Sequence, residues 1–249
     1  MRTIRLAGLA GVLMLVAAQA NASPLTVNAT DSVYGAANSG NGATDPVSVT
    51  LNAATTSLTF TGVTGSITNG CVSTEGCITI NHGSGDTLNN PDGVGAANNF
   101  SGTGNGSLSG IKTSGAGALV GVFVAGTPSG TAPATLDFSG SGATSFTSLS
   151  PLLDQVFFIG DGLTGPGDGT GSKQQFNVPS GATTLYLGLA DACGYSGSPS
   201  CYGDNLGSYT VTVNQAPVTR TVPEPASFAT LAVGMLGLMG VARTQRKRA

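Results

Sequence analysis

The sequence has no tryptophan, a single histidine and few charged residues, which make up 8% of the 249 residues. With only His82 available, a Ser-His-Asp hydrolase or a histidine-rich metal centre has almost no side chains to draw on. Low charge together with 39 glycines is also typical of disordered chains. However, Val, Ile, Leu and Phe recur in short alternating runs, which indicates folded β structure, and one domain is the simplest expectation.

Basic residues are almost absent from the middle of the chain. Between Ser23 and Pro225, all twelve acidic residues stand against three basic ones: Lys112, Lys173 and Arg220. A phosphate backbone is bound by clustered Lys and Arg, so this balance argues against nucleic acid as a partner. Nearly all of the acids are aspartate, which is typical of turns and also of loops that bind hard cations such as Ca²⁺.

The four cysteines form two close pairs, Cys71 with Cys77 and Cys193 with Cys201. Each pair closes a short Gly-rich loop, and in an exported protein this spacing predicts two local disulfides. A zinc site would need closer, CxxC-like spacing and further histidines, so we do not expect one.

The N-terminus predicts export. Arg2 and Arg5 form a basic region, Leu6 to Ala18 a short apolar region, and Ala20 and Ala22 frame a small-residue cleavage site. This order is typical of a Sec signal peptide, so residues 1–22 are expected to form a signal helix and to be removed.

The C-terminus carries a second address. Val222-Pro223-Glu224-Pro225 is followed by the apolar stretch 226–242 and by a basic cluster over residues 243–248. The stretch predicts a transmembrane helix that crosses the inner membrane transiently, with the basic cluster on the cytoplasmic side. The three parts in this order resemble the PEP-CTERM sorting signal of Gram-negative bacteria. The resemblance implies cleavage by exosortase and a surface or matrix protein associated with exopolysaccharide and biofilm.

The body between these addresses, residues 23–217, is predicted to be all-β. Candidate strands are Val47–Leu51, Ser57–Val63, Cys77–Ile80, Ala118–Val124, Gln155–Ile159, Lys173–Val178, Thr184–Ala190 and Ser208–Val213. Each is short and bounded by turn residues, so we expect an antiparallel β-sandwich of jelly-roll or galactose-binding-like type. Gly-rich stretches at Asn38–Thr44, Gly83–Gly117 and Thr127–Ser150 are expected to be long loops.

One segment, Gln174 to Val213, suggests a metal site. A strand ending at Asp191 is followed by the cysteine-bounded loop and by the turn Tyr202-Gly203-Asp204-Asn205. Ca²⁺ takes six to eight oxygens from carboxylates, amides and backbone carbonyls, and this segment supplies several of them. Gly-Asp-Asn is also a good turn sequence in its own right, which is the alternative.

The same segment resembles the bacterial galactophilic lectins of the PA-I type, which are calcium-dependent β-sandwiches. The resemblance implies Ca²⁺ ligands from the side chains of Asp191, Asp204 and Asn205 and the backbone carbonyl of Cys201, with a further carbonyl near Ser66. It also implies that two neighbouring sugar hydroxyls fill the open positions of the ion directly, and that Asp191 and Asp204 are part of the carbohydrate-binding site.

The resemblance extends to Asn90-Pro91-Asp92-Gly93, where Asn90 and Asp92 are the implied sugar contacts. In this family a His and a Gln flank the Pro-Asp pair, and here those places hold Asn90 and Gly93. The sugar is therefore not predicted to be galactose specifically.

Catalysis is not expected. Glu75 and Glu224 are the only glutamates, so a paired-carboxylate glycosidase site has few candidates. The run Gly160 to Gly169 lacks the Lys of a P-loop and the final Glu of an EF-hand, and it is predicted to be a flexible hairpin connection. The sequence therefore predicts a calcium-dependent carbohydrate-binding module. The alternative is a structural matrix or adhesion protein that binds no sugar and binds calcium for stability or not at all.

Overall fold

The computed structural model describes residues 22–37, 43–68, 88–93 and 99–217. These residues are almost entirely strands and loops, with helical turns only at η1 (Val33–Ala36), η2 (Cys193–Tyr195) and η3 (Tyr202–Asp204). The strands are β1 (Leu25–Asn28), β2 (Val47–Thr50), β3 (Thr55–Thr68), β4 (Phe100–Asn105), β5 (Leu108–Thr113), β6 (Leu119–Val124), β7 (Leu136–Phe138), β8 (Ser148–Leu149), β9 (Val156–Phe158), β10 (Gln175–Asn177), β11 (Thr184–Leu189), β12 (Ser196–Gly197) and β13 (Leu206–Pro217). By internal contacts the chain divides into two units, Met1–Ala216 and Pro217–Ala249.

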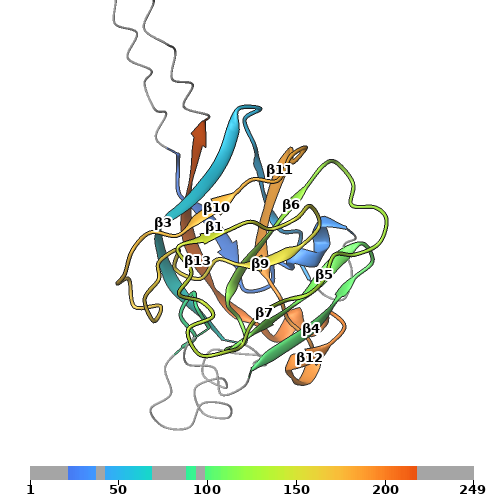
Figure 1. Cartoon of the computed structure of the whole chain (residues 1–249). Coiled ribbons are helices and arrows are strands. Elements are labelled where there is room, and N and C mark those ends of the chain that lie inside the picture. The colour runs from blue at the N-terminus through green and yellow to red at the C-terminus, as the bar shows by residue number, and fades with distance from the viewer. Residues whose placement is uncertain (1–21, 38–42, 69–87, 94–98, 218–249) are drawn as a thin grey trace, which may run out of the picture. The chain divides into compact units, whose positions relative to one another are not determined.

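The strands form three sheets (Figure 1). The first sheet has the order β1-β13-β3-β10-β8, the second β2-β11-β6-β9 and the third β12-β4-β5-β7. Antiparallel pairs build the centre of the second sheet, where β11 pairs with both β2 and β6. Parallel pairs occur at sheet edges, between β8 and β10, between β12 and β4, and between β5 and β7.

In the second sheet, β6 and β9 are apolar on both faces, whereas the edge strand β2 alternates half-buried Val with exposed Ser and Thr. Every residue of β6 is buried, and Leu119 and Phe123 belong to one hydrophobic cluster while Val120 belongs to another. β9 divides in the same way. Phe157 stacks on Phe123 with ring centroids 5.0 Å apart, whereas Phe158 lies 5.6 Å from Phe138 of the third sheet. The second sheet therefore contributes to the hydrophobic core on both of its sides, towards the first and the third sheet, which explains why β6 and β9 are continuously apolar.

The first sheet buries only one face. Val27, Leu58, Phe176 and Tyr209 belong to the cluster shared with the second sheet, so their strand neighbours face away from it. We call this outward surface the polar face. It consists of Thr26, Asn28, Ser57, Thr59, Thr61, Ser148, Gln175, Asn177, Ser208, Thr210, Thr212 and Asn214, all of which are exposed or half-buried.

The all-β prediction is confirmed, but the expected loops were wrong in two places. The stretch 83–117 contains β4 and β5, and the stretch 127–150 contains β7 and β8. The glycines that make β4 and β5 look like loops are required by close packing. A Cβ on Gly102 would lie 2.8 Å from the ring of Phe100, and one on Gly110 would clash with the backbone carbonyl of Gly102. These strands lack the usual β-branched pattern because their neighbours leave no room for it.

Several other predictions fall at the limits of the described residues. The expected strand Cys77–Ile80, the Cys71–Cys77 disulfide and the signal and sorting segments lie outside these residues, apart from Ala22. In the ranges that are described, no helix is long and apolar enough to cross a membrane. The two-sheet sandwich is not confirmed, because the strands form three sheets.

Candidate functional site

Asp191 lies just beyond the end of β11, at the start of the loop that leads to η3. Its side chain is 3% exposed, although it is a carboxylate. The backbone N–H of Ala192 donates to its Oδ1 at 2.7 Å, and Nδ2 of Asn205 donates to its Oδ2 at 2.8 Å. Burial of a charged group is costly unless it is paired or hydrogen-bonded, and both of these bonds offset part of that cost.

The loop after Asp191 is held at both of its ends. The backbone N–H of Ser200 donates to the carbonyl of Asp191 at 3.1 Å. The backbone N–H of Cys193 donates to Oγ of Ser200 at 3.1 Å. A disulfide joins Cys193 to Cys201, which confirms one of the two predicted pairings. These links fix the residues that immediately precede Asp204.

Tyr202 anchors η3 in the core. Its ring is 1% exposed, its hydroxyl accepts a hydrogen bond from the backbone N–H of Asp191 at 3.0 Å, and it donates to the carbonyl of Leu189 at 3.3 Å. The resemblance to the lectins implied that this tyrosine is part of a turn motif. In the structure it positions the backbone of Asp191 from across the loop, and a buried tyrosine hydroxyl of this kind normally finds such a partner.

Asp204 and Asn205 complete the group that we call the Asp191 corner, which consists of Asp191, Cys201, Asp204 and Asn205. Asn205 is 2% exposed and its Nδ2 also donates to the carbonyl of Ala29 at 3.1 Å. Oδ1 of Asp204 is buried and has no hydrogen-bond partner. A buried acceptor without a protein partner is rare in native structures and is normally explained by an ordered water, an ion or a proton.

The electrostatics of the corner are those of two nearby acids. Burial raises the pKa of Asp191 to about 7, the hydrogen bonds from Asn205 and Ala192 oppose that rise, and the charge of Asp204 adds to it.

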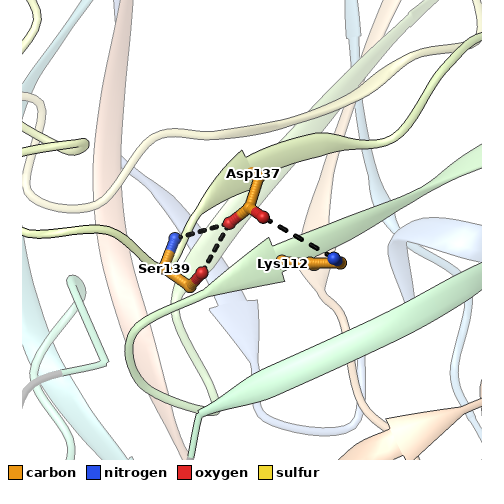
Figure 2. A network of polar contacts seen from close by, with 3 residues as sticks. All are labelled: Lys112, Asp137 and Ser139. Carbon is orange, nitrogen blue, oxygen red and sulfur yellow. Dashed lines mark hydrogen bonds and ion pairs between the residues drawn. The ribbon is translucent and has the colours of Figure 1, made fainter.

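The described residues contain two basic side chains, Lys112 and Lys173. Lys112 lies 3.6 Å from Asp137 on the exposed edge of the third sheet (Figure 2). A cation at the corner would therefore relieve a repulsion between carboxylates.

The predicted backbone ligand near Ser66 also lies at this end of the first sheet. The carbonyl of Ser66 faces Gly207 so closely that a Cβ there would clash with it. Gly207 follows Asn205 by two positions, and its carbonyl accepts from the backbone N–H of Ala29. β3 and β13 thus bring the Ser66 region beside the turn that carries Asp204 and Asn205.

Asn90 and Asp92 make their contacts elsewhere. Nδ2 of Asn90 donates to the carbonyl of Gly167 at 2.6 Å. Oδ1 of Asp92 accepts from the backbone N–H of Asp161 at 2.7 Å. These two bonds tie both implied sugar contacts to the connection between β9 and β10, and neither bond involves a residue of the Asp191 corner.

This connection is better organised than a flexible hairpin. Asp161 is 5% exposed, and its carboxylate accepts from the backbone N–H groups of Leu163 at 2.9 Å and Gly169 at 3.0 Å. Burial raises the pKa of Asp92 to about 7, and the charges of Asp161 and Asp168 add to the effect. The sequence did not predict this acidic group because Asp92 is distant in sequence and the Gly-Asp-Gly spacing matched no known motif. The sequence signal that could have indicated this group is a set of aspartates between glycines directly after a fully apolar strand.

Neither acidic group forms a metal centre from carboxylates alone. Across residues 22–37, 43–68, 88–93 and 99–217, no three His, Cys, Asp or Glu side chains come together in a way that could hold a metal ion. A calcium site at the Asp191 corner would therefore depend on amide and backbone oxygens, as the sequence-based hypothesis assumed.

Comparison with known families identifies the C-terminus. The model of the PEP-CTERM protein-sorting motif matches residues 221–247. The chain carries an exosortase sorting signal. It is therefore an exported protein, made as a membrane-anchored precursor and sorted to the cell surface, and the motif confirms that part of the sequence analysis. No curated protein and no solved structure matches the chain, so the lectin resemblance of the body has no relative to support it.

Proposed function

We propose that the sorted body is a calcium-dependent carbohydrate-binding module whose ion lies at the Asp191 corner. The observation that carries the proposal is the buried, unpartnered Oδ1 of Asp204 beside the buried carboxylate of Asp191. A divalent cation supplies a partner for the first and neutralises the second. Carboxylate, amide and carbonyl oxygens are also the ligands that Ca²⁺ prefers.

The proposal assigns four ligands to the ion: one carboxylate oxygen each from Asp191 and Asp204, Oδ1 of Asn205 and the backbone carbonyl of Cys201. Nδ2 of Asn205 already donates to Asp191, so the same amide would hold the acid and offer its oxygen to the ion. The disulfide and the Ser200 contacts fix the loop before binding, which lowers the ordering cost.

Four protein ligands leave Ca²⁺ with open coordination positions. Two neighbouring hydroxyls of a sugar can fill them, which gives the module its carbohydrate specificity. No catalytic role is assigned to any residue. The sugar would belong to an exopolysaccharide of the surface or matrix to which the sorting signal directs the protein.

Thermal unfolding of the exported protein tests both steps. At calcium concentrations about 100 times Kd, binding to the folded state alone stabilises by about 2.7 kcal/mol. For a domain of this size that corresponds to a rise in Tm of roughly 5–10 °C over the chelated protein. A suitable monosaccharide should add a further rise only in the presence of calcium.

Asp191→Asn and Asp204→Asn should each abolish the calcium response. Asp137→Asn is the matched control, since Asp137 is an exposed acid bonded to Ser139 and Lys112 (Figure 2). If calcium does not change the Tm of the wild type, the proposed site is wrong. If calcium raises the Tm but no sugar adds to it, the alternative holds, and the protein is a structural matrix or adhesion element that uses the ion for stability.

A further inference from the structure

The polar face of the first sheet has an unusual composition. The twelve residues that define it, which come from all five strands, are Ser, Thr, Asn or Gln, and none is charged. Cross-strand partners repeat the pattern, with Thr26 opposite Thr210, Ser57 opposite Asn177 and Ser148 opposite Gln175. Solvent-exposed sheets ordinarily mix both signs of charge for solubility and to prevent association. The ion pair of Lys112 and Asp137, for comparison, lies on the third sheet.

Several of these side chains are already held in place by one another. Nε2 of Gln175 donates to Oδ1 of Asn177 at 2.9 Å, and Nδ2 of Asn177 donates to Oγ of Ser148 at 3.2 Å and of Ser150 at 2.8 Å. Nδ2 of Asn214 donates to Oγ1 of Thr61 at 2.8 Å. The threonines are stiff at χ1 because they are β-branched. When a partner binds here, the side chains of the polar face would thus lose little conformational entropy.

Hydroxyl and amide groups both donate and accept hydrogen bonds. On a sheet they repeat at about 4.8 Å across strands and about 6.8 Å along each strand. Such a grid complements a partner that also carries many uncharged groups able to donate and accept, and desolvating uncharged groups costs far less than desolvating ions. An anionic polymer would find no basic side chain on this face and would be repelled by the acidic body.

We propose that the polar face is a second, calcium-independent docking surface for a neutral polysaccharide chain. It is separate from the Asp191 corner and does not depend on an ion there. Binding would rest on many weak hydrogen bonds along the sheet, with no aromatic stacking, since none of its outward positions is aromatic.

The test is a pelleting assay with the exported protein in chelator, using amorphous cellulose and cross-linked dextran as neutral probes and an alginate gel as the anionic probe. We expect binding to at least one neutral probe and none to alginate. The double variant Thr210→Lys, Asn177→Lys should reduce this binding by at least tenfold. The double variant Ser101→Lys, Thr103→Lys places the same two charges on the exposed surface of β4 and should leave binding unchanged. A Tm equal to that of the wild type in every variant shows that the variants are correctly folded.

Three outcomes would overturn the proposal. The first is no binding to either neutral probe, and the second is binding that the double variant retains. The third is self-association in analytical ultracentrifugation that the lysines disrupt, because the face would then be an interface between copies. If the first outcome holds in chelator, but binding appears with calcium and is lost in Asp204→Asn and not in the double variant, all carbohydrate binding belongs to the Asp191 corner.

Discussion

Asp92→Asn should make the protein more stable at neutral pH and weaken the dependence of its stability on pH. Asp92 is 4% exposed. Its pKa is raised to about 7, first by burial and then by the charges of Asp161 and Asp168, while the backbone N–H of Asp161 opposes the rise. In the unfolded chain the same group titrates near 3.8. Between these two pH values the folded state holds a proton that the unfolded state has released.

The direction of this pH dependence follows from the linkage between proton binding and folding. The contribution of Asp92 is fully present below about pH 4, is lost as the pH rises towards 7, and is constant above it. A shift of about three pKa units corresponds to about 4 kcal/mol at 1.36 kcal/mol per unit, and partial solvent screening reduces this to roughly 2–4 kcal/mol. Asparagine keeps an oxygen for the Asp161 N–H and carries no charge, so the variant should gain most of this free energy at pH 8.

The assay is urea unfolding in chelator at several pH values between 4 and 8. The free energy of unfolding should depend less steeply on pH in the variant than in the wild type. The difference in slope should be up to about 1.4 kcal/mol per pH unit, which corresponds to one proton. Residual slope is expected, because Asp191 also has its pKa raised to about 7, mainly by burial. The control is Asp137→Asn, which removes the charge of an exposed acid. If the variant has the same pH slope and the same urea midpoints as the wild type, the ionised Asp92 does not destabilise the folded state, and the reasoning is wrong.

Three further predictions concern stability. Cys193→Ser with Cys201→Ser opens a loop of sequence separation 8; it should lower the free energy of unfolding by about 2.5 kcal/mol and weaken the calcium response, as measured by urea unfolding with and without the ion. Phe157→Ala and Phe158→Ala should each cost about 3–5 kcal/mol, since the second sheet buries both faces; a small loss in either would mean that one face is poorly packed. Gly102→Ala should cost about 1–3 kcal/mol because the new Cβ meets the Phe100 ring, whereas Gly203→Ala, with nothing within 4 Å, should be close to neutral by thermal unfolding.

The strands that the sequence predicted are those in which apolar residues recur at about every second position. Leu119–Val124 and Thr184–Leu189 lie within one residue of their predicted limits because they form the centre of a sheet that is buried on both faces. β4 and β5 were missed because their glycines interrupt the alternation. The hairpin between them nevertheless has a recognisable signal, since the two-residue connection Gly106-Ser107 begins with a glycine whose φ is 60°.

Asp191 and Asp161 show what decides whether a site residue can be read from sequence. Both follow a buried strand, and both are almost fully buried. Asp191 could be proposed as a ligand from sequence because Cys201, Asp204 and Asn205 lie within the next fourteen positions, on and just after a short disulfide-closed loop. The partner of Asp161 is Asp92, 69 positions away, and only the folded chain brings the two together. Local loops thus expose their chemistry to sequence reasoning, whereas groups assembled across sheets do not. The polar face is intermediate: each strand contributes one or more uncharged polar residues, and the absence of charge acquires meaning only when all five strands are placed side by side.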